Sequence, residues 1–389
     1  MARITRVRLT AINTPRTSGL VCGHVIVELL TDVDGLIGVG EMSDLQHLPR
    51  FHVDVEDLER TLTAILSDLD PLNLNEASRR LEESFPQAGN LYDKSSVIKC
   101  GVDIAIWDLV GKLSGRSVSD LLGGRVRESL PIAYPIFRQR TARDVEANLE
   151  LVAAKLADGF SRFRVYVGRE LQLDEQFLRR ARADFGDAVR IKSLDFSNLL
   201  DARDACAFIE RTRDLDYELV EAPARSGDSA GLAYVRDRAL LPVSEHVYSD
   251  RWALELVTAR AVDILNVGLF ALGGITPVRR VLAIAEAAGL RCLVGTTQEL
   301  SIGTAAAAHV GASASVVTVA SDPVGPLLYL EDVVREKARY AGGELVVPTG
   351  PGLGVELDRT RLDAVAGPLS WSGGGVVDVI DRIGAPAHA

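Results

Sequence analysis

Hydrophobic and polar positions divide the chain into regions of different rhythm. Near the N-terminus apolar residues alternate with polar ones, as in strands, and the turn sequence at 32–35 predicts a hairpin. Helical periodicity follows and is interrupted at Pro71. The expected strands are 3–9, 23–30 and 38–41, and the expected helices are 55–69, 74–85 and 95–113. Residues 1–125 are therefore predicted to form an α+β domain.

From residue 131 short apolar segments alternate with helical ones. This alternation predicts a parallel sheet, and about eight such units predict a closed TIM-type barrel. The expected strands are 132–137, 163–167, 189–194, 218–220, 241–243, 264–267, 291–294 and 315–318. The helices expected between them are 144–155, 174–183, 202–212, 251–259 and 277–288. We predict an α/β fold, with the barrel over 126–326 and a glycine-rich, hairpin-like segment over 327–389.

Composition excludes several classes of protein. The 389-residue chain has 43 basic and 54 acidic residues, a net charge of −11, and no dense basic run, so nucleic acid is not an expected partner. No long apolar segment stands out, so neither secretion nor membrane insertion is expected. The four cysteines are scattered within apolar stretches. We expect them to be buried free thiols, which fits a reducing cytoplasm.

Three acidic residues follow three successive apolar strands. Asp195, Glu221 and Glu245 lie 26 and 24 residues apart, so in a parallel barrel they point into the same mouth. Each alone is well explained as a solvated loop carboxylate. Together they would repel one another unless a cation held them, and carboxylate oxygens prefer Mg²⁺, Mn²⁺ or Ca²⁺ to zinc. Such an ion binds a substrate carboxylate and stabilises the enediolate formed when the neighbouring carbon loses its proton.

Several segments, in the same order, resemble the enolase superfamily in its mandelate racemase and muconate lactonizing branch. They are 35–41 (Gly-Leu-Ile-Gly-Val-Gly-Glu), 101–112, 220–223 (Val-Glu-Ala-Pro), 273–276 (Gly-Gly-Ile-Thr) and 350–355. The resemblance implies a (β/α)7β barrel capped by an α+β domain from both chain ends. It also implies one Mg²⁺ per subunit on Asp195, Glu221 and Glu245, a small carboxylate substrate, and a homo-oligomer between dimer and octamer. The last segment could otherwise cradle a phosphate, but no Lys-Ser/Thr follows it, so a structural tail is expected.

The second barrel strand departs from the commonest family pattern. Lys-x-Lys is usual there, whereas this chain has Arg164 and Tyr166, which share the inward face because strand side chains alternate. Tyr166 replaces the usual lysine base, and a phenol with a pKa of about 10 needs nearby cations for that role. The sixth strand ends in Gly268, without the lysine of epimerases and cycloisomerases or the aspartate of racemases. The Arg-x-Tyr pair resembles the galactarate dehydratases, which are acid-sugar dehydratases that use tyrosines.

The same resemblance implies further site residues. Tyr92 and His246 are candidate general acids and complete a catalytic set with Arg164 and Tyr166. Ser197 replaces a side chain that can assist the leaving group, so the identity of the acid stays open. Each of these residues could instead have an ordinary loop or packing role. The predicted substrate-binding residues are His47, Lys192, Thr297 and Glu299.

The sequence therefore predicts a Mg²⁺-dependent hydro-lyase. Tyr166 removes the proton α to a carboxylate, the β-hydroxyl leaves, and a 2-keto-3-deoxy acid results, with a lid from residues 15–55 closing over the site. Two alternatives stay open. One is a racemase, epimerase or cycloisomerase of the same superfamily, and the other is a non-catalytic metal-binding homologue.

Overall fold

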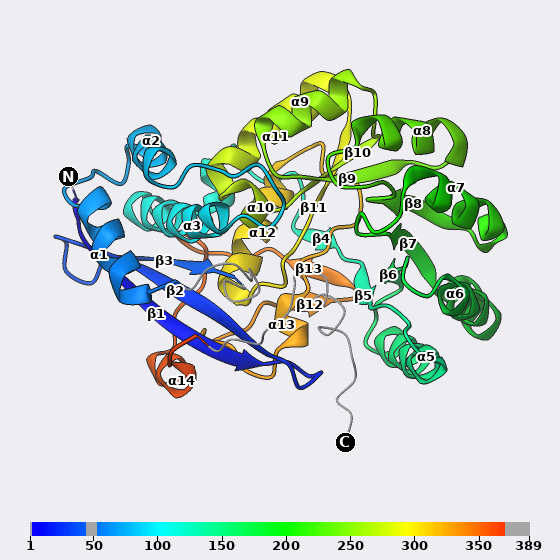
Figure 1. Ribbon diagram of the computed structural model, residues 1–389. Helices are drawn as coiled ribbons and strands as arrows, with labels where there is room; N and C mark the ends of the chain where they lie inside the picture. The colour runs from blue at the N-terminus through cyan, green and yellow to red at the C-terminus, as the bar shows by residue number, and fades with distance from the viewer. Residues whose placement is uncertain (1, 44–52, 370–389) are drawn as a thin grey trace.

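The computed structural model describes residues 2–43 and 53–369, and His47, a predicted substrate-binding residue, lies outside these ranges. The N-terminal region is an antiparallel sheet of β1 (Ile4–Pro15), β2 (Val21–Thr31) and β3 (Ile37–Met42). Helices α1 (Val55–Leu66), α2 (Leu74–Ser84) and α3 (Lys94–Ser114) accompany it. Figure 1 shows this region beside the barrel. The expected α+β character is confirmed, although β1 is longer than predicted because its pairing with β2 continues to Pro15 and Val21.

Helix α3 is buried on nearly all sides, because glycines let β3 approach it closely. A Cβ atom on Gly40 would lie 2.0 Å from the carbonyl oxygen of Gly101. Only glycine therefore fits at this contact. The close approach places the sheet firmly on α3, which itself packs against two barrel helices, α10 (Leu269–Leu272) and α11 (Ile275–Ala288).

Seven parallel strands form most of the barrel, in the order of the chain. They are β5 (Tyr134–Ile136), β6 (Arg162–Tyr166), β7 (Arg190–Asp195), β8 (Tyr217–Glu221), β9 (Val243–Val247), β10 (Ile264–Val267) and β11 (Arg291–Val294). The ring is closed by residues 316–322, where Val317 bridges Cys292 and Ser321 bridges Ile132. This segment takes the place of the eighth strand expected at 315–318. The TIM-type fold is thus confirmed.

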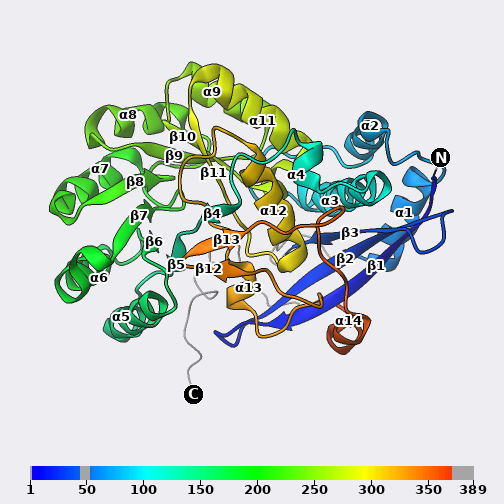
Figure 2. The ribbon, with the colours of Figure 1, turned by 180° about the vertical axis from the view of Figure 1, so that it is seen from behind.

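Helices surround the barrel (Figures 1 and 2). They are α5 (Ala142–Ala157), α6 (Leu171–Phe185), α7 (Ala202–Arg211), α8 (Ser229–Ala239), α9 (Asp250–Thr258), α10 (Leu269–Leu272), α11 (Ile275–Ala288) and α12 (Ser301–Ser313). The pattern did not predict α8 or α12. Every residue of α12 from Ser301 to Ala312 is buried, so this helix has no polar face and no amphipathic signal.

The C-terminal part returns to the first domain, as expected. It contains α13 (Gly325–Leu328), the hairpin β12 (Tyr340–Ala341) and β13 (Glu344–Val346), and α14 (Arg359–Val365). β13 pairs with β4 (Ser129–Pro131), which follows α4 (Val118–Leu121), and Ala366 bridges Ile12 of β1. In Figure 2, α14 lies beside the β1–β2 edge of the sheet. The domain limits at 125 and 326 stay predictions.

Two expectations about the whole chain can be compared with the structure. All four cysteines are free; three are buried, while Cys206 is only half-buried. Among the residues described, no helix combines the length and apolar character needed to cross a membrane.

Candidate active site

The ends of adjacent barrel strands place Tyr166, Asp195 and Glu221 side by side. They are the last residues of β6, β7 and β8, and in the strand register Tyr166 is opposite Asp195 and Asp195 is opposite Glu221. Glu245 follows Ser244, the partner of Glu221 in β9. Tyr166 is 8% exposed and the three carboxylates at most 3%. The structure therefore gathers the predicted carboxylates at the carboxyl ends of neighbouring strands, where barrel enzymes place their sites.

Arg164 connects this group to the phenol. Its Nη2 donates a hydrogen bond to the Tyr166 hydroxyl, and its Nη1 donates to Asp322 Oδ2 at 3.0 Å. The guanidinium also lies 3.7 Å from Glu221 and 3.9 Å from Asp195. Both side chains of the Arg-x-Tyr pair thus point into the barrel, as strand alternation predicts.

The environment of Tyr166 favours the neutral phenol in the arrangement described. Burial raises its pKa; the Arg164 charge opposes this, but the nearby carboxylates Asp195, Glu221 and Asp322 raise the pKa further. Arg164 alone therefore does not make the phenol acidic. Additional positive charge beside the carboxylates is needed before Tyr166 can accept a proton at neutral pH.

Lys192 faces the barrel interior because of a bulge between β6 and β7. The register passes from Phe163 opposite Ile191 to Arg164 opposite Ser193, which leaves Lys192 as the extra residue. Its side chain is fully buried, with Nζ 2.8 Å from Asp322 Oδ1 and 3.5 Å from Glu221 Oε2. Lys192 is therefore a counter-ion of Asp322 and Glu221. Substrate binding by Lys192 stays a prediction.

His246 is a second group able to move a proton. Its Nε2 lies 3.3 Å from Glu221 Oε1 and its Nδ1 lies 3.5 Å from Glu245 Oε1, while 21% of the side chain is exposed. Burial opposes the charged form, but the nearby carboxylates of Glu245, Glu221 and Asp195 raise its pKa to about 9. His246 is therefore a cationic proton donor in this arrangement.

The three carboxylates offer hard oxygen donors of the kind that Mg²⁺ prefers. Buried Glu221 Oε2 has no hydrogen-bond donor, whereas Oε1 accepts from Asn266 Nδ2 at 2.9 Å. Asp195 accepts both bonds from Ser197 on Oδ1, which leaves Oδ2 without a hydrogen-bond donor among the described residues, whereas Glu245 accepts from Asn198 Nδ2 on Oε2 and from the His246 backbone N–H on Oε1. The donor set thus fits a divalent cation. As they stand, however, the described side chains include no group of three or more His, Cys, Asp or Glu residues arranged to hold a metal, and the ligand role stays a prediction.

The loop after β11 contains Thr297 and Glu299, and the hydrogen bonds of the Glu299 carboxylate are all to residues of the same loop. Glu299 accepts from the Thr297 backbone at 2.6 Å and its hydroxyl at 3.0 Å, and from the Thr296 hydroxyl at 2.5 Å. Between them lies Gln298, which sequence reasoning missed. It has a positive φ of 70°, and its buried Oε1 has no partner. An amide in this state is a candidate substrate contact, and only its place between the predicted binding residues Thr297 and Glu299 could have indicated it.

The N-terminal domain reaches the site through the tip of its first hairpin. Leu20, between β1 and β2, packs against the stacked rings of Phe137 and Tyr166, whose centroids are 5.3 Å apart. No sequence pattern marked Leu20. Tyr92 lies in the loop before α3 and is 40% exposed. Its role as an acid stays a prediction.

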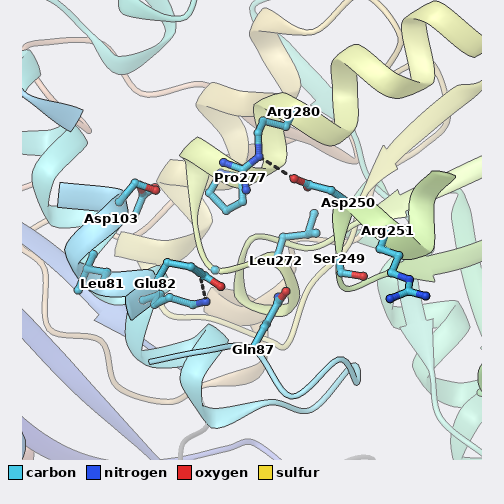
Figure 3. A pocket seen from close by; sticks show the side chains of 13 residues that line it. Leu81, Glu82, Gln87, Asp103, Ser249, Asp250, Arg251, Leu272, Pro277 and Arg280 are labelled. Atoms are coloured by element: carbon cyan, nitrogen blue, oxygen red, sulfur yellow. Dashed lines mark hydrogen bonds and ion pairs between the residues drawn. The ribbon is translucent and has the colours of Figure 1, made fainter. Parts of the chain in front are cut away.

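A separate cavity of about 340 Å³ lies between α2 and α3 of the first domain and α9, α10 and α11 of the barrel (Figure 3). None of the predicted site residues lines it. Four of its six charged residues form two ion pairs, Lys99 with Glu82 at 2.5 Å and Arg280 with Asp250 at 2.7 Å, and Asp103 accepts from the Thr276 backbone. The cavity is therefore a junction between domains rather than part of the candidate active site.

A closed parallel barrel with buried charged groups at its strand ends and an α+β domain beside them defines a capped TIM-barrel architecture. Residues 3–123 match the mandelate racemase/muconate lactonizing enzyme N-terminal domain, and residues 148–361 match the enolase C-terminal domain-like family. The chain therefore belongs to the mandelate racemase and muconate lactonizing branch of the enolase superfamily. Enzymes of this branch generally use a divalent metal, typically Mg²⁺.

Named relatives indicate the range of reactions in this branch. The chain is 30% identical to a chloromuconate cycloisomerase of Cupriavidus necator over 353 residues, covering 87% of this chain and 90% of the relative. It is 26% identical to the N-succinyl-L-Arg/Lys racemase of Bacillus cereus over 370 residues, or 92% and 97% of the chains. The muconate lactonizing enzyme of Pseudomonas putida superimposes with a TM-score of 0.84 at 26% identity, covering 94% and 100%. The names of these relatives support isomerase chemistry better than they support the predicted dehydration.

Proposed function

We propose that this protein is a divalent-metal-dependent enzyme that removes the proton α to a carboxylate, with Tyr166 as the proton acceptor. We further propose that the net reaction is β-elimination of water from a polyhydroxylated acid. One observation carries the proposal: the buried Arg164–Tyr166 pair lies directly beside Asp195 and Glu221. A phenol bonded to a guanidinium has a cationic donor that favours the phenolate once the carboxylate charge is offset.

The barrel is asymmetric across the site, which favours a reaction with a single base. β6 and β10 lie equally far apart around the ring in both directions, so they face each other. β6 contributes Tyr166, whereas β10 and the following Gly268 contribute no titratable side chain. Inversion at the α-carbon by two bases needs one on each face, and β10 does not supply the lysine that epimerases have there.

His246 supports an elimination in which one group accepts a proton and another donates one. It lies on β9 rather than on the β6 side, and its ring nitrogens are 3.3 Å from Glu221 Oε1 and 3.5 Å from Glu245 Oε1. Tyr166 takes the α-proton, and His246 protonates the departing β-hydroxyl so that it leaves as water. The resulting enol then tautomerises to a 2-keto-3-deoxy acid.

Asp195, Glu221 and Glu245 would hold the cation. When bound, a divalent cation would bind the substrate carboxylate, offset the negative charge that develops on the substrate, and offset the carboxylate charges that raise the pKa of Tyr166. Arg164 keeps its hydrogen bond on the phenol throughout, and Leu20 covers the Phe137–Tyr166 stack. A covered, preorganised site stabilises developing charge best.

Cycloisomerisation is the second candidate, and the names of the relatives favour it. It is an intramolecular addition to a double bond, which also needs only one group to handle the proton. The asymmetry of the barrel is therefore compatible with it. The polar, hydrogen-bonding surroundings of the site, with Gln298 and His246, support a hydroxylated substrate instead.

The test is a substrate panel in D₂O with Mg²⁺, using aldaric acids, aldonic acids, muconate-type dienes and N-acylamino acids, followed by NMR. A keto-acid product supports dehydration. Lactone formation from a diene supports cycloisomerisation, and α-deuterium uptake with inversion supports epimerisation; either would replace dehydration. Absence of both turnover and α-exchange across the panel, with Mg²⁺ bound, would favour the non-catalytic alternative.

A further inference from the structure

A fourth carboxylate, Asp322, lies among the charged groups of the barrel interior and has no role in the mechanism above. It is 1% exposed and is the last residue of the segment that closes the ring, where its backbone N–H donates to the Val294 carbonyl at 2.9 Å. Each of its two oxygens accepts a hydrogen bond from a different cation: Oδ1 from Lys192 Nζ at 2.8 Å and Oδ2 from Arg164 Nη1 at 3.0 Å. A single buried carboxylate therefore holds both buried cations.

Both cations are also within reach of the predicted metal ligands. Lys192 Nζ is 3.5 Å from Glu221 Oε2, the buried oxygen that has no hydrogen-bond donor, and Arg164 Nη1 is 3.7 Å from Glu221 Oε1. Their shorter contacts are with Asp322. Without Asp322, each cation would gain by moving the short remaining distance to Glu221, because a buried charge requires a partner.

We propose that Asp322 is a positioning residue that holds Lys192 and Arg164 away from Glu221. It thereby keeps the carboxylates available to a divalent cation and fixes Arg164 on the Tyr166 hydroxyl. The inference rests on the proposed function in one respect, since it takes Asp195, Glu221 and Glu245 as the cation ligands. It does not depend on which acid is the substrate.

The test is Mg²⁺ binding to the metal-free full chain by isothermal titration calorimetry. Asp322→Asn keeps the shape but removes the charge, and we expect about 10- to 100-fold weaker binding, as for other groups that support metal ligands. Replacing Lys192 by Met in the Asp322→Asn chain should recover much of the loss, because no freed ammonium competes for Glu221. In the parent chain, Lys192→Met should change the affinity much less.

Asp108→Asn is the matched control. Asp108 is also fully buried and pairs with a lysine, Lys112, at 2.6 Å. Its other oxygen accepts from the Leu353 backbone N–H at 2.9 Å, in the first domain's contact with the C-terminal part. We expect this variant to lose stability and to keep the parent Mg²⁺ affinity. If Asp322→Asn does not fold, the smaller replacement Asp322→Ser serves in the same comparison.

Two results would overturn the inference and leave the proposed function standing. One is a parent-like Mg²⁺ affinity in folded Asp322→Asn. The other is an equal effect of Lys192→Met in both backgrounds, which would mean that Asp322 contributes only its overall charge. If the parent chain itself binds no Mg²⁺, the metal-ligand assignment fails, and the proposed function fails with it.

Discussion

Replacing Tyr166 by phenylalanine tests the most unusual feature of the site. The change removes one oxygen and keeps the ring, which is stacked on Phe137 and covered by Leu20. Arg164 loses the acceptor for its Nη2 but retains Asp322. The perturbation therefore removes the proposed proton acceptor with little change in packing.

The effect on activity should exceed the effect on stability. A general base contributes about 10²- to 10⁴-fold to the rate, which corresponds to roughly 3–5 kcal/mol of the activation barrier. Loss of one hydrogen bond to a buried charged group costs about 1–3 kcal/mol of unfolding free energy. Since folded domains have about 5–15 kcal/mol, most molecules remain folded, and instability cannot explain a large loss of turnover.

The assay measures kcat on the acid identified by the substrate panel, together with Mg²⁺ affinity and thermal unfolding. Tyr217→Phe is the matched control. It removes another buried phenol, bonded to Thr212 and to the Ile209 carbonyl at 3.2 Å, at the opposite end of β8 from Glu221. The control should lose stability but not kcat. A Tyr166→Phe enzyme that keeps its kcat within about tenfold of the parent would refute the role of Tyr166.

Three further changes have expected outcomes. Glu221→Gln should weaken Mg²⁺ binding more than about tenfold by calorimetry, and an unchanged affinity would remove it from the ligand set. Leu20→Ala should lower kcat/KM by admitting water beside Tyr166, at a cost of at most about 2 kcal/mol because Leu20 is half-buried; unchanged kinetics would argue against a lid role. Burial raises the pKa of Asp174 from 3.8 to about 7. The folded chain then holds a proton that the unfolded chain releases, so this group lowers stability as pH rises from about 4 to 7. Asp174→Asn should remove that part of the fall, and denaturant titrations showing the same pH dependence in both proteins would contradict the assignment.

Much of the site could be predicted from the regular geometry of strands and of strand-and-helix units. Alternation along β6 is enough to place Arg164 and Tyr166 on one face, because successive strand side chains point to opposite sides. The spacing of Asp195, Glu221 and Glu245 likewise follows from repeated strand-and-helix units, each of which ends at the same mouth. Neither inference requires knowing which distant segments of the chain come into contact.

Other features depended on segments far apart in the sequence. Helix α12 has no polar face, because the barrel on one side and the first domain on the other bury it completely, so no periodicity marked it. Leu20 and Tyr166 are 146 positions apart, and their contact exists only because the first hairpin reaches the barrel. Patterns within a short window contain no information on such contacts.

The amino-acid sequence by itself determined the alternation of strands and helices, the inward pair on β6 and the row of three carboxylates. Tertiary structure alone decided the direction of Lys192, which a bulge against β6 turns inward, and the pairing of Asp322 with both buried cations. The physical reason is that side-chain direction in a regular strand is a local property. The partner of a buried charge, in contrast, is fixed by whichever distant segment closes around it.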